Sequence, residues 1–322
     1  MTAESEAIAK NVTFDADGCT LAGTFTAVSC PVAAALMITG SGKTNRDSDV
    51  RLPGGLMLRG RITRACAEVL AAEGVSSLRY DKRGVGASGG DYLSIGMPQR
   101  HADAQAGLSW LADRCPGLPL IVLGHSEGTY YAAQLASEDN GVAGAVLLSG
   151  SVRPGGEVLT YQTEELADRL PASAKVVLRL MRTDAVRSQR KNLAKIMSSS
   201  ADVIRVQGTR VNARWIRDFV RHDPAPALTC ITVPLLAITG GHDLQVPPAD
   251  VEAMGRLVRG PFEGHVVGDL SHMLRPDPGS VGPRGYRRQA RQPVSPEVLG
   301  IISGWVRRNW SQRDRLLRSR EI

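Results

Sequence analysis

The sequence predicts an α/β fold, in which a mostly parallel central sheet of about eight strands is flanked by helices. Three observations carry this prediction. Strand-like and helix-like segments alternate through the first half of the chain, a charged helical region follows, and strand-like segments then return. Alternating strands and helices favour parallel pairing with right-handed crossovers. The simplest arrangement is therefore one α/β core that carries a helical insertion.

The first half of the chain predicts a hairpin and then strands in alternation with helices. Asp17-Gly18 is a turn dipeptide between two alternating segments, so residues 12–25 predict the hairpin. Residues 56–72 place apolar side chains at helical spacing, and Gly74 follows where a helix C-cap is expected. Short apolar runs suit strands that are buried on both faces. Such strands are expected at 33–38, 75–80, 118–123 and 142–148, with helices at 99–112 and 129–137.

The second half begins with the charged region and then returns to the core. Candidate helices in the charged region span 157–170, 174–182, 187–198 and 212–221, and residues 223–226 are expected to form a linker. Strands are expected at 233–238 and 261–267, with helices at 249–258 and 296–310. Residues 276–296 are rich in Pro, Gly and Arg, which predicts a mobile loop. We expect residues 1–151 and 226–322 to form the core and residues 152–225 to form a helical lid.

Composition excludes several classes of protein. A hydrophobic content of 43% with 22% charged residues is typical of a folded globular chain rather than a disordered one. The longest wholly apolar run, residues 32–38, is far too short to span a bilayer. The first residues show no apolar signal segment, and five scattered cysteines show no CxxC spacing. We therefore expect a cytoplasmic protein with reduced thiols, and neither a disulfide framework nor a zinc site.

The net charge of +7 is unevenly distributed. Residues 284–322 and 152–225 carry +7 and +6, and the remainder carries −6. Basic regions can attract nucleic acid or anionic substrates. These regions contain few aromatic side chains for base stacking, so a nucleic-acid partner is not expected. Solvated surface arginine is the more common explanation of such charge.

Residues 124–128 (GHSEG) contain the most informative motif in the chain. This G-x-S-x-G directly follows an apolar strand and precedes a helix, which is the setting of a nucleophile elbow. The turn strains the backbone of Ser126 and crowds the positions two residues before and after it, where only glycine fits. The serine hydroxyl is thereby held clear of the sheet, beside the positive end of the following helix.

A serine nucleophile needs a base, and in this architecture the partners follow in the order Ser, Asp or Glu, His. Asp243 lies just after a predicted strand. His265 falls within the predicted strand 261–267, whereas His272 follows that strand in a loop, where an imidazole can reach the elbow. Asp243 would orient the imidazole and stabilise its charged form. The three residues lie after the carboxyl ends of predicted strands in the required order, so we expect them to form a triad.

Four motifs together resemble the α/β-hydrolase superfamily. Residues 38–47, 80–88, 124–128 and 243–248 occur in this order and look like those of the bacterial EstD-type carboxylesterases, which are related to serine aminopeptidases and dienelactone hydrolases. The resemblance implies the α/β-hydrolase fold, a Ser126–Asp243–His272 triad, esterase activity on acyl esters and a helical cap. It also implies that the backbone N–H groups of Ser41 and Glu127 form the oxyanion hole.

Two other glycine motifs have a weaker interpretation. Gly42-Lys43-Thr44 ends like a phosphate-binding loop, but the first glycine of that motif would have to stand at Met37. Residues 84–89 match G-x-G-x-x-G, yet they do not follow the first strand of a βαβ unit and no apolar helix start comes after them. We therefore do not expect nucleotide binding.

The predicted function is that of a serine hydrolase, most simply a carboxylesterase that acts on small to medium acyl esters. This chemistry requires no metal or organic cofactor. A peptidase, thioesterase or acyltransferase could use the same residues, because the fold and the triad do not determine the acceptor. A hydrolase fold that binds a small molecule without catalysis is a further alternative. The sequence leaves homo-oligomerisation open.

Overall fold

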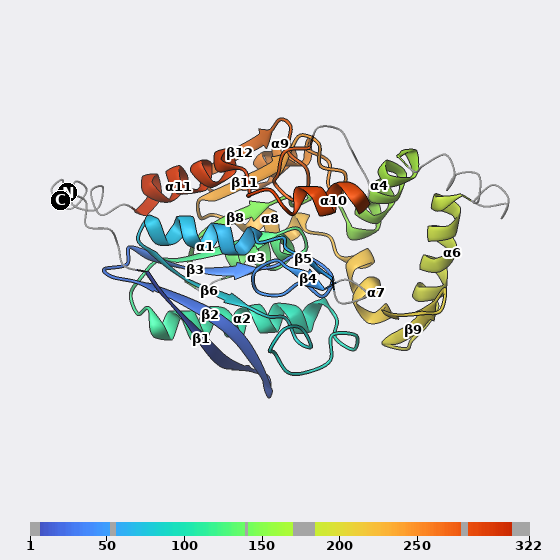
Figure 1. Ribbon diagram of the computed structural model, residues 1–322, viewed down its shortest axis with the longest axis horizontal. Helices are drawn as coiled ribbons and strands as arrows, with labels where there is room; N and C mark the ends of the chain where they lie inside the picture. The colour runs from blue at the N-terminus through green and yellow to red at the C-terminus, as the bar shows by residue number, and fades with distance from the viewer. Residues whose placement is uncertain (1–6, 52–55, 139–140, 170–183, 278–282, 311–322) are drawn as a thin grey trace.

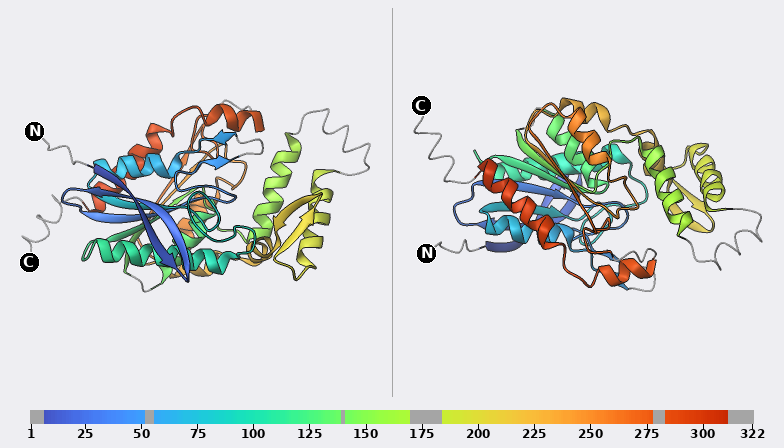
Figure 2. Two further views of the ribbon diagram at one scale, coloured as in Figure 1. Left: turned by 60° about the horizontal axis from the view of Figure 1, so that its bottom comes forward. Right: turned by 90° about the horizontal axis from the view of Figure 1, so that it is seen from above.

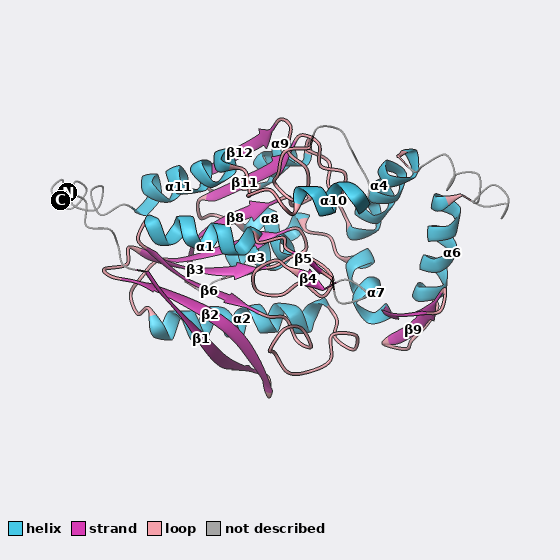
Figure 3. Cartoon of the chain, in the orientation of Figure 1, coloured by secondary structure: helices cyan, strands magenta, loops and turns pink. Residues whose placement is uncertain are grey.

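The computed structural model describes residues 7–51, 56–138, 141–169, 184–277 and 283–310. Its centre is an eight-stranded sheet in the order β1-β2-β6-β3-β7-β8-β11-β12 (Figure 1, Figure 3). The β1–β2 and β2–β6 pairs are antiparallel, and all later pairs are parallel. The predicted α/β class and mostly parallel sheet are confirmed. The strands are β1 (Ala7–Ala16), β2 (Cys19–Val28), β3 (Ala33–Ile38), β6 (Val75–Tyr80), β7 (Leu120–His125), β8 (Val142–Leu148), β11 (Leu235–Gly240) and β12 (Phe262–Val267).

Helices cover both faces of the sheet because its central strands are apolar on both sides. In β3, Ala34 and Leu36 belong to one core cluster, and Ala35 and Met37 belong to the other. Figure 2 shows the resulting layers. The first cluster is closed by α2 (Met97–Arg114), α3 (Gly128–Ser137), α8 (Ala225–Cys230) and α9 (Asp250–Leu257), and the second by α1 (Ile62–Ala72) and α11 (Pro296–Trp310). None of the helices in the described residues combines the length and apolar character that a membrane span requires.

The region predicted to be an insertion lies beyond the carboxyl ends of the parallel strands, at the right of Figure 1. It contains helices, as expected, but residues 203–212 form a hairpin that the sequence analysis missed. Gln207 and Gly208 have φ angles of 48° and 81°, which are typical of a tight hairpin turn. The predicted helix at 174–182 lies outside the described residues. The elements are α4 (Gly155–Asp168), α6 (Ala185–Met197), β9 (Val203–Val206), β10 (Thr209–Asn212) and α7 (Ala213–Arg221).

The helix predicted over residues 56–72 begins later than expected. A short β4–β5 ladder (Val50–Arg51 with Met57–Leu58) precedes it, and α1 starts only at Ile62. A Cβ on Gly60 would lie 1.9 Å from the Ser48 carbonyl oxygen, and Arg61 has a φ of 49°. A helix cannot continue through this close backbone contact and left-handed residue, so the apolar periodicity overstated its length.

The prediction of a mobile loop at residues 276–296 is wrong for its central part. Pro283–Gln289 form the helix α10, and Gln289 is buried and accepts a hydrogen bond from Ser271 Oγ at 2.8 Å. The linker predicted at 223–226 likewise runs into α8, which begins at Ala225. In both segments a proline stands at or next to the helix start, where its missing N–H costs nothing. The proline content therefore predicted irregular structure where a helix begins.

Candidate active site

Ser126 occupies the turn between β7 and α3 with a φ of 54°. This left-handed conformation is unfavourable for a serine and is typical of functional positions. A Cβ on Gly124 would lie 2.3 Å from the Gly128 carbonyl oxygen, and one on Gly128 would lie 2.2 Å from that of Ile38. Only glycine permits this packing. The turn therefore holds the Ser126 side chain at the carboxyl edge of the sheet.

The structure brings the three predicted residues Ser126, His272 and Asp243 into one hydrogen-bonded chain. His272 Nε2 lies 2.9 Å from Ser126 Oγ, and His272 Nδ1 lies 2.8 and 3.0 Å from the two carboxylate oxygens of Asp243. Asp243 Oδ1 also accepts the backbone N–H groups of Gln245 at 2.8 Å and Val246 at 3.1 Å. Asp243 and His272 are 2% and 4% exposed. The carboxylate is thus fixed by the loop after β11, and it in turn fixes the imidazole ring.

His125 holds the loop that carries His272, a role the sequence analysis did not anticipate. Its Nε2 lies 3.1 Å from the His272 carbonyl oxygen, and the two imidazole rings are 5.2 Å apart between centroids. Burial, together with the neighbouring His272, lowers the pKa of His125 to about 3. The ring is therefore neutral near pH 7, and its Nε2–H is the donor to this carbonyl. His125 therefore positions the His272 backbone through this hydrogen bond and carries no charge near pH 7.

Ser41 lines the same cavity as Ser126, and Glu127 follows Ser126 in the chain. A Cβ on Gly40 would lie 3.1 Å from Ser126 Cβ, so the loop after β3 packs directly against the serine. Thr44 Oγ1 donates to the Ser41 carbonyl oxygen at 2.6 Å and steadies this loop. Across the described residues, neither the Ser41 nor the Glu127 N–H donates to a protein acceptor. Both N–H groups are therefore without a protein partner in the described residues.

The buried Lys82 side chain holds the same loop in place through two hydrogen bonds. Its Nζ donates to the carbonyl oxygens of Gly40 and Gly42, the latter at 2.7 Å, and the side chain is buried. Burial lowers the pKa of Lys82 to about 7, with a smaller opposing effect from Glu127. A neutral amine keeps two N–H groups, so both carbonyls retain a donor in either protonation state.

Replacing Lys82 with methionine is expected to lower the free energy of unfolding by about 1–3 kcal/mol, because the buried Gly40 carbonyl loses its donor. Unfolded lysine has a pKa near 10.5, so the unfolded chain binds more protons than the folded one between pH 7 and 10.5. The stability advantage of the wild type over Lys82→Met should therefore increase as pH rises through this range.

Urea unfolding of both proteins at pH 7, 8 and 9 measures this difference. Lys43→Met, a change at an exposed neighbour in the same loop, is the matched control and should alter stability little. A stability difference between wild type and Lys82→Met that stays constant with pH would contradict the proposed titration of Lys82.

The Glu127 side chain links the elbow to the insertion. One of its carboxylate oxygens accepts from Arg100 at 2.6 Å, from the Tyr131 hydroxyl at 2.6 Å and from Trp215 Nε1 of α7 at 2.8 Å. Burial alone would raise the pKa of Glu127, but the positive charges of Arg100 and Lys82 outweigh it and hold that pKa below its ordinary value. This ion pair is fully buried, and removing one partner would leave an uncompensated charge.

The elbow opens into a cavity of about 560 Å³. Its lining combines Ser126 and His272 with mostly apolar side chains and the loop around Ser41. Cavities of this size and character bind small molecules. The full described lining is Gly40, Ser41, Thr44, Ser48, Val50, Leu58, Gly60, Ile62, His125, Ser126, Gln245, His272, Met273, Tyr286 and Arg287.

The glycines of residues 84–89 have a structural use. A Cβ on Gly86 would lie 2.2 Å from Asp81 Oδ2, and the Ala87 N–H donates to that oxygen at 3.0 Å. Asp81 also pairs with Arg46 at 2.7 Å. The turn therefore wraps a carboxylate of the protein itself, in a place where a phosphate-binding loop would present its N–H groups to a ligand.

Comparison with known proteins identifies the family. The family described as serine aminopeptidase, S33, matches residues 50–278, which include Ser126, Asp243 and His272. The chain belongs to the serine aminopeptidase S33 family. Its sheet order and elbow are those of an α/β hydrolase, so the predicted resemblance and fold are confirmed.

One curated protein and two solved structures illustrate this similarity. The curated esterase EstD of Thermotoga maritima is 24% identical over 281 residues, which is 86% of this chain but only 63% of that protein. The Pyrococcus furiosus esterase Pf2001 matches with a TM-score of 0.59 at 17% identity, covering 95% of this chain and 92% of that one. Est1E from Butyrivibrio proteoclasticus, solved with ferulic acid, matches with a TM-score of 0.61 at 15% identity, covering 92% and 98%.

In this S33 chain, some residues of the site were predicted from the sequence and others were found only in the structure. Ser126, His272 and the Ser41 loop line one cavity, and Asp243 is hydrogen-bonded to His272 without lining it. His265 is a strand residue whose Nε2 pairs with Glu263 Oε1 at 2.8 Å, away from this chain of hydrogen bonds. His125, Lys82 and the Glu127 side chain were missed. Their only sequence signal is that they lie within the motifs at 80–88 and 124–128.

Proposed function

We propose that this protein is a serine hydrolase that cleaves carboxylic esters through an acyl-enzyme intermediate. The hydrogen-bonded chain from Ser126 through His272 to Asp243, open to a largely apolar cavity, is the observation that carries this proposal. Nucleophile and base within hydrogen-bond reach, with the base oriented by a third group, is the arrangement that activates a serine hydroxyl. The esterase relatives named above support the same chemistry.

In the first half of the reaction, Ser126 Oγ attacks the ester carbonyl carbon while its proton passes to His272 Nε2. Asp243 accepts the Nδ1–H of His272, which leaves the Nε2 lone pair facing the serine and stabilises the imidazolium that forms. The negative oxygen of the tetrahedral intermediate lies between the N–H groups of Ser41 and Glu127. Collapse breaks the bond to the alcohol oxygen, and His272 returns the proton to it.

In the second half, water replaces the alcohol. His272 Nε2 takes a proton from the water as its oxygen attacks the acyl-enzyme carbonyl. The second tetrahedral intermediate meets the same two N–H groups and collapses by breaking the bond to Ser126 Oγ, which regains its proton from His272. The acid leaves and the enzyme returns to its starting state, so protons and bonds balance over the cycle.

The lining of the cavity favours esters over peptides with a free amino end. An aminopeptidase site needs an acidic or other acceptor group for the substrate ammonium. The described lining holds no Asp or Glu, and it includes the cation Arg287. Thioesters and acyl transfer to other alcohols use the same residues, and they are distinguished by the substrate panel below.

Residues 152–225 act in this proposal as a lid over the cavity, attached to the core at residues 1–151 and 226–322. Two contacts of α4 reach the loop that carries the aspartate of the triad. Tyr161 OH donates to the Asp243 carbonyl oxygen at 3.4 Å, and Gln162 Nε2 donates to that of Gln245 at 3.1 Å. With the Trp215–Glu127 bond, they connect the lid to both sides of the elbow.

Labelling with a fluorophosphonate tests the proposal independently of the natural substrate. The activated serine should displace fluoride, and mass spectrometry should find the adduct on the peptide that contains Ser126. Turnover of p-nitrophenyl esters with acyl chains of two to sixteen carbons, of acyl-CoA thioesters and of aminoacyl amides then ranks the substrate classes. An adduct on another serine, or no adduct with a folded protein, would contradict the assignment.

A further inference from the structure

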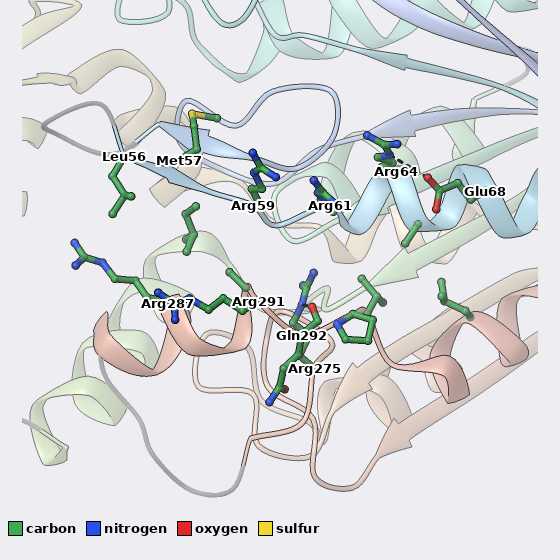
Figure 4. Close-up of a pocket in the computed structure, with 16 residues that line it drawn as sticks. Leu56, Met57, Arg59, Arg61, Arg64, Glu68, Arg275, Arg287, Arg291 and Gln292 are labelled. Carbon is green, nitrogen blue, oxygen red and sulfur yellow. Dashed lines mark hydrogen bonds and ion pairs between the residues drawn. The ribbon is translucent and has the colours of Figure 1, made fainter.

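A second cavity, of about 770 Å³, adjoins the one that contains Ser126. One wall is formed by α1 and the segment that leads into it, and the other by α10 and the segment after it (Figure 4). Leu58 and Arg287 line both cavities. A molecule that extends from the catalytic serine past these two residues would enter the second cavity.

Arginine dominates the walls of this second cavity. Glu68 is the single acidic residue in the described lining, and it pairs with Arg64 at 3.0 Å. Arginine side chains lie on both walls of the cavity (Figure 4). The six residues are Arg59, Arg61 and Arg64 on the first wall, with Arg275, Arg287 and Arg291 on the second.

Four of these arginines form no direct ion pair in the described residues, although the Asp49 carboxylate interacts electrostatically with Arg59, Arg61 and Arg275. No ion pair joins the side chains of Arg59, Arg61, Arg287 or Arg291 to a described carboxylate. The nearby Asp49 lies outside the lining and accepts the backbone N–H of Arg61 at 3.2 Å. Cations that converge on a shared cavity repel one another, and a bound anion relieves this repulsion.

Arg275 adds a permanent charge at the base of the cavity. It is 1% exposed, and its guanidinium donates to the carbonyl oxygens of Gly60 at 2.6 Å, Met273 at 3.0 Å and Gln292 at 2.8 Å, all of them neutral acceptors. Burial lowers its pKa only to about 10, so it stays protonated near pH 7. Arg275 also ties the first wall to the second, which gives the cavity a defined shape.

Between the arginines the lining is apolar. Leu56 and Met57 are 49% and 41% exposed on the first wall, and Ala290, Pro293 and Val294 face them from the second. Such a surface suits an apolar chain that ends in an anion better than a small inorganic ion alone. Arginine is also the side chain that best matches carboxylate and phosphate oxygens, because its planar fork donates two parallel hydrogen bonds.

We propose that the arginine-lined cavity binds an oxyanion carried by the substrate at the end of an apolar chain, several bonds from the scissile ester. This inference rests on the proposed function and adds a substrate class to it, namely anionic acyl esters. Arg59 and Arg291 hold the oxyanion from opposite walls, and Arg287 stands between it and the catalytic serine. The source of the charge is a carboxylate or a phosphate, which share this recognition chemistry.

A pair of esters with equal chain length tests the inference. p-Nitrophenyl hexanoate is neutral, and p-nitrophenyl hydrogen adipate carries a terminal carboxylate, while a third ester ends in phosphate. The rate with Ser126→Ala is subtracted, because a terminal carboxylate can attack its own aryl ester. The wild type should prefer an anionic ester in kcat/KM, and added salt should reduce this preference. The better of the two anionic esters identifies the source of the charge.

The double variant Arg59→Gln with Arg291→Gln should reduce the ratio of anionic to neutral kcat/KM by about 5- to 50-fold, chiefly through KM, because charge-assisted contacts are lost from a partly exposed pocket. Arg256→Gln, on the exposed face of α9, is the matched control and should leave the ratio unchanged. Equal kcat/KM for neutral and anionic esters in the wild type, with Ser126-dependent turnover, would overturn this inference alone. Absence of Ser126 labelling would overturn the proposed function instead.

Discussion

Replacing Ser126 with alanine is expected to lower kcat for p-nitrophenyl esters by about 10⁶-fold, the effect of losing a triad nucleophile. His272 Nε2, 2.9 Å from the serine oxygen, would have no hydroxyl to deprotonate. The two backbone N–H groups beside the elbow would remain, so a weak rate above that of water should persist. Steady-state kinetics across the ester series measures the loss, and circular dichroism checks that the variant is folded.

Two further variants complete this experiment: a control at another serine, and a double variant that tests whether Ser126 and His272 act together. Ser137→Ala lies on the same helix, α3, and removes only a local bond to the Gln134 carbonyl oxygen, so activity should stay near that of the wild type. Ser126→Ala combined with His272→Ala should be no slower than Ser126→Ala alone, because the two residues act as a unit. A Ser126→Ala enzyme within tenfold of wild-type turnover would exclude Ser126 as the nucleophile.

Replacing Asp243 with asparagine is expected to lower kcat by about 10⁴-fold with little change in KM, because the imidazole would adopt the wrong tautomer. Asp243 Oδ1 accepts two backbone N–H groups, so the carbonyl oxygen of an asparagine would take that position. Its NH₂ group would then face His272 Nδ1 at the place of Oδ2, 2.8 Å away. Nδ1 would have to accept, Nε2 would carry the proton, and the ring could not accept the proton of Ser126.

The effect of Asp243→Asn on kcat and KM is measured by steady-state kinetics over a range of ester concentrations. The rate of fluorophosphonate labelling is a second readout. Labelling should slow in parallel with kcat, since both report activation of the serine. Asp269→Asn changes an exposed carboxylate in the loop that carries His272 and serves as the control. More than a tenth of wild-type turnover in Asp243→Asn would mean that another group orients the imidazole.

Local patterns in the sequence were sufficient to predict the central strands and the meeting of Ser126, Asp243 and His272 at one edge of the sheet. A strand buried on both faces is a continuous apolar run, and β3, β7 and β8 each show one. The loops that follow the carboxyl ends of parallel strands meet at one edge of the sheet. Ser126, Asp243 and His272 each stand in or just after such a loop, so chain order alone indicated that they would meet.

The same local patterns failed where a tertiary contact overrides them. The apolar periodicity of residues 56–72 continued through Gly60, but the packing of Gly60 against Ser48 delays the start of the helix to Ile62. The Pro- and Arg-rich composition of 276–296 predicted a loop, but Gln289 is buried against Ser271 and orders α10. In each segment the deciding partner lies more than ten residues away along the chain.

The sequence by itself therefore determined the fold class, the elbow and the order of the three residues that meet there. Only the tertiary structure showed that Lys82 fastens the loop around Ser41, that His125 holds the His272 backbone, and that arginines from two distant segments face one cavity. Arg275 and Gly60 are 215 residues apart in the chain and hydrogen-bonded in the fold. Strand and helix patterns repeat every few residues and can be read locally, whereas the charge and shape of a cavity depend on which distant segments pack together.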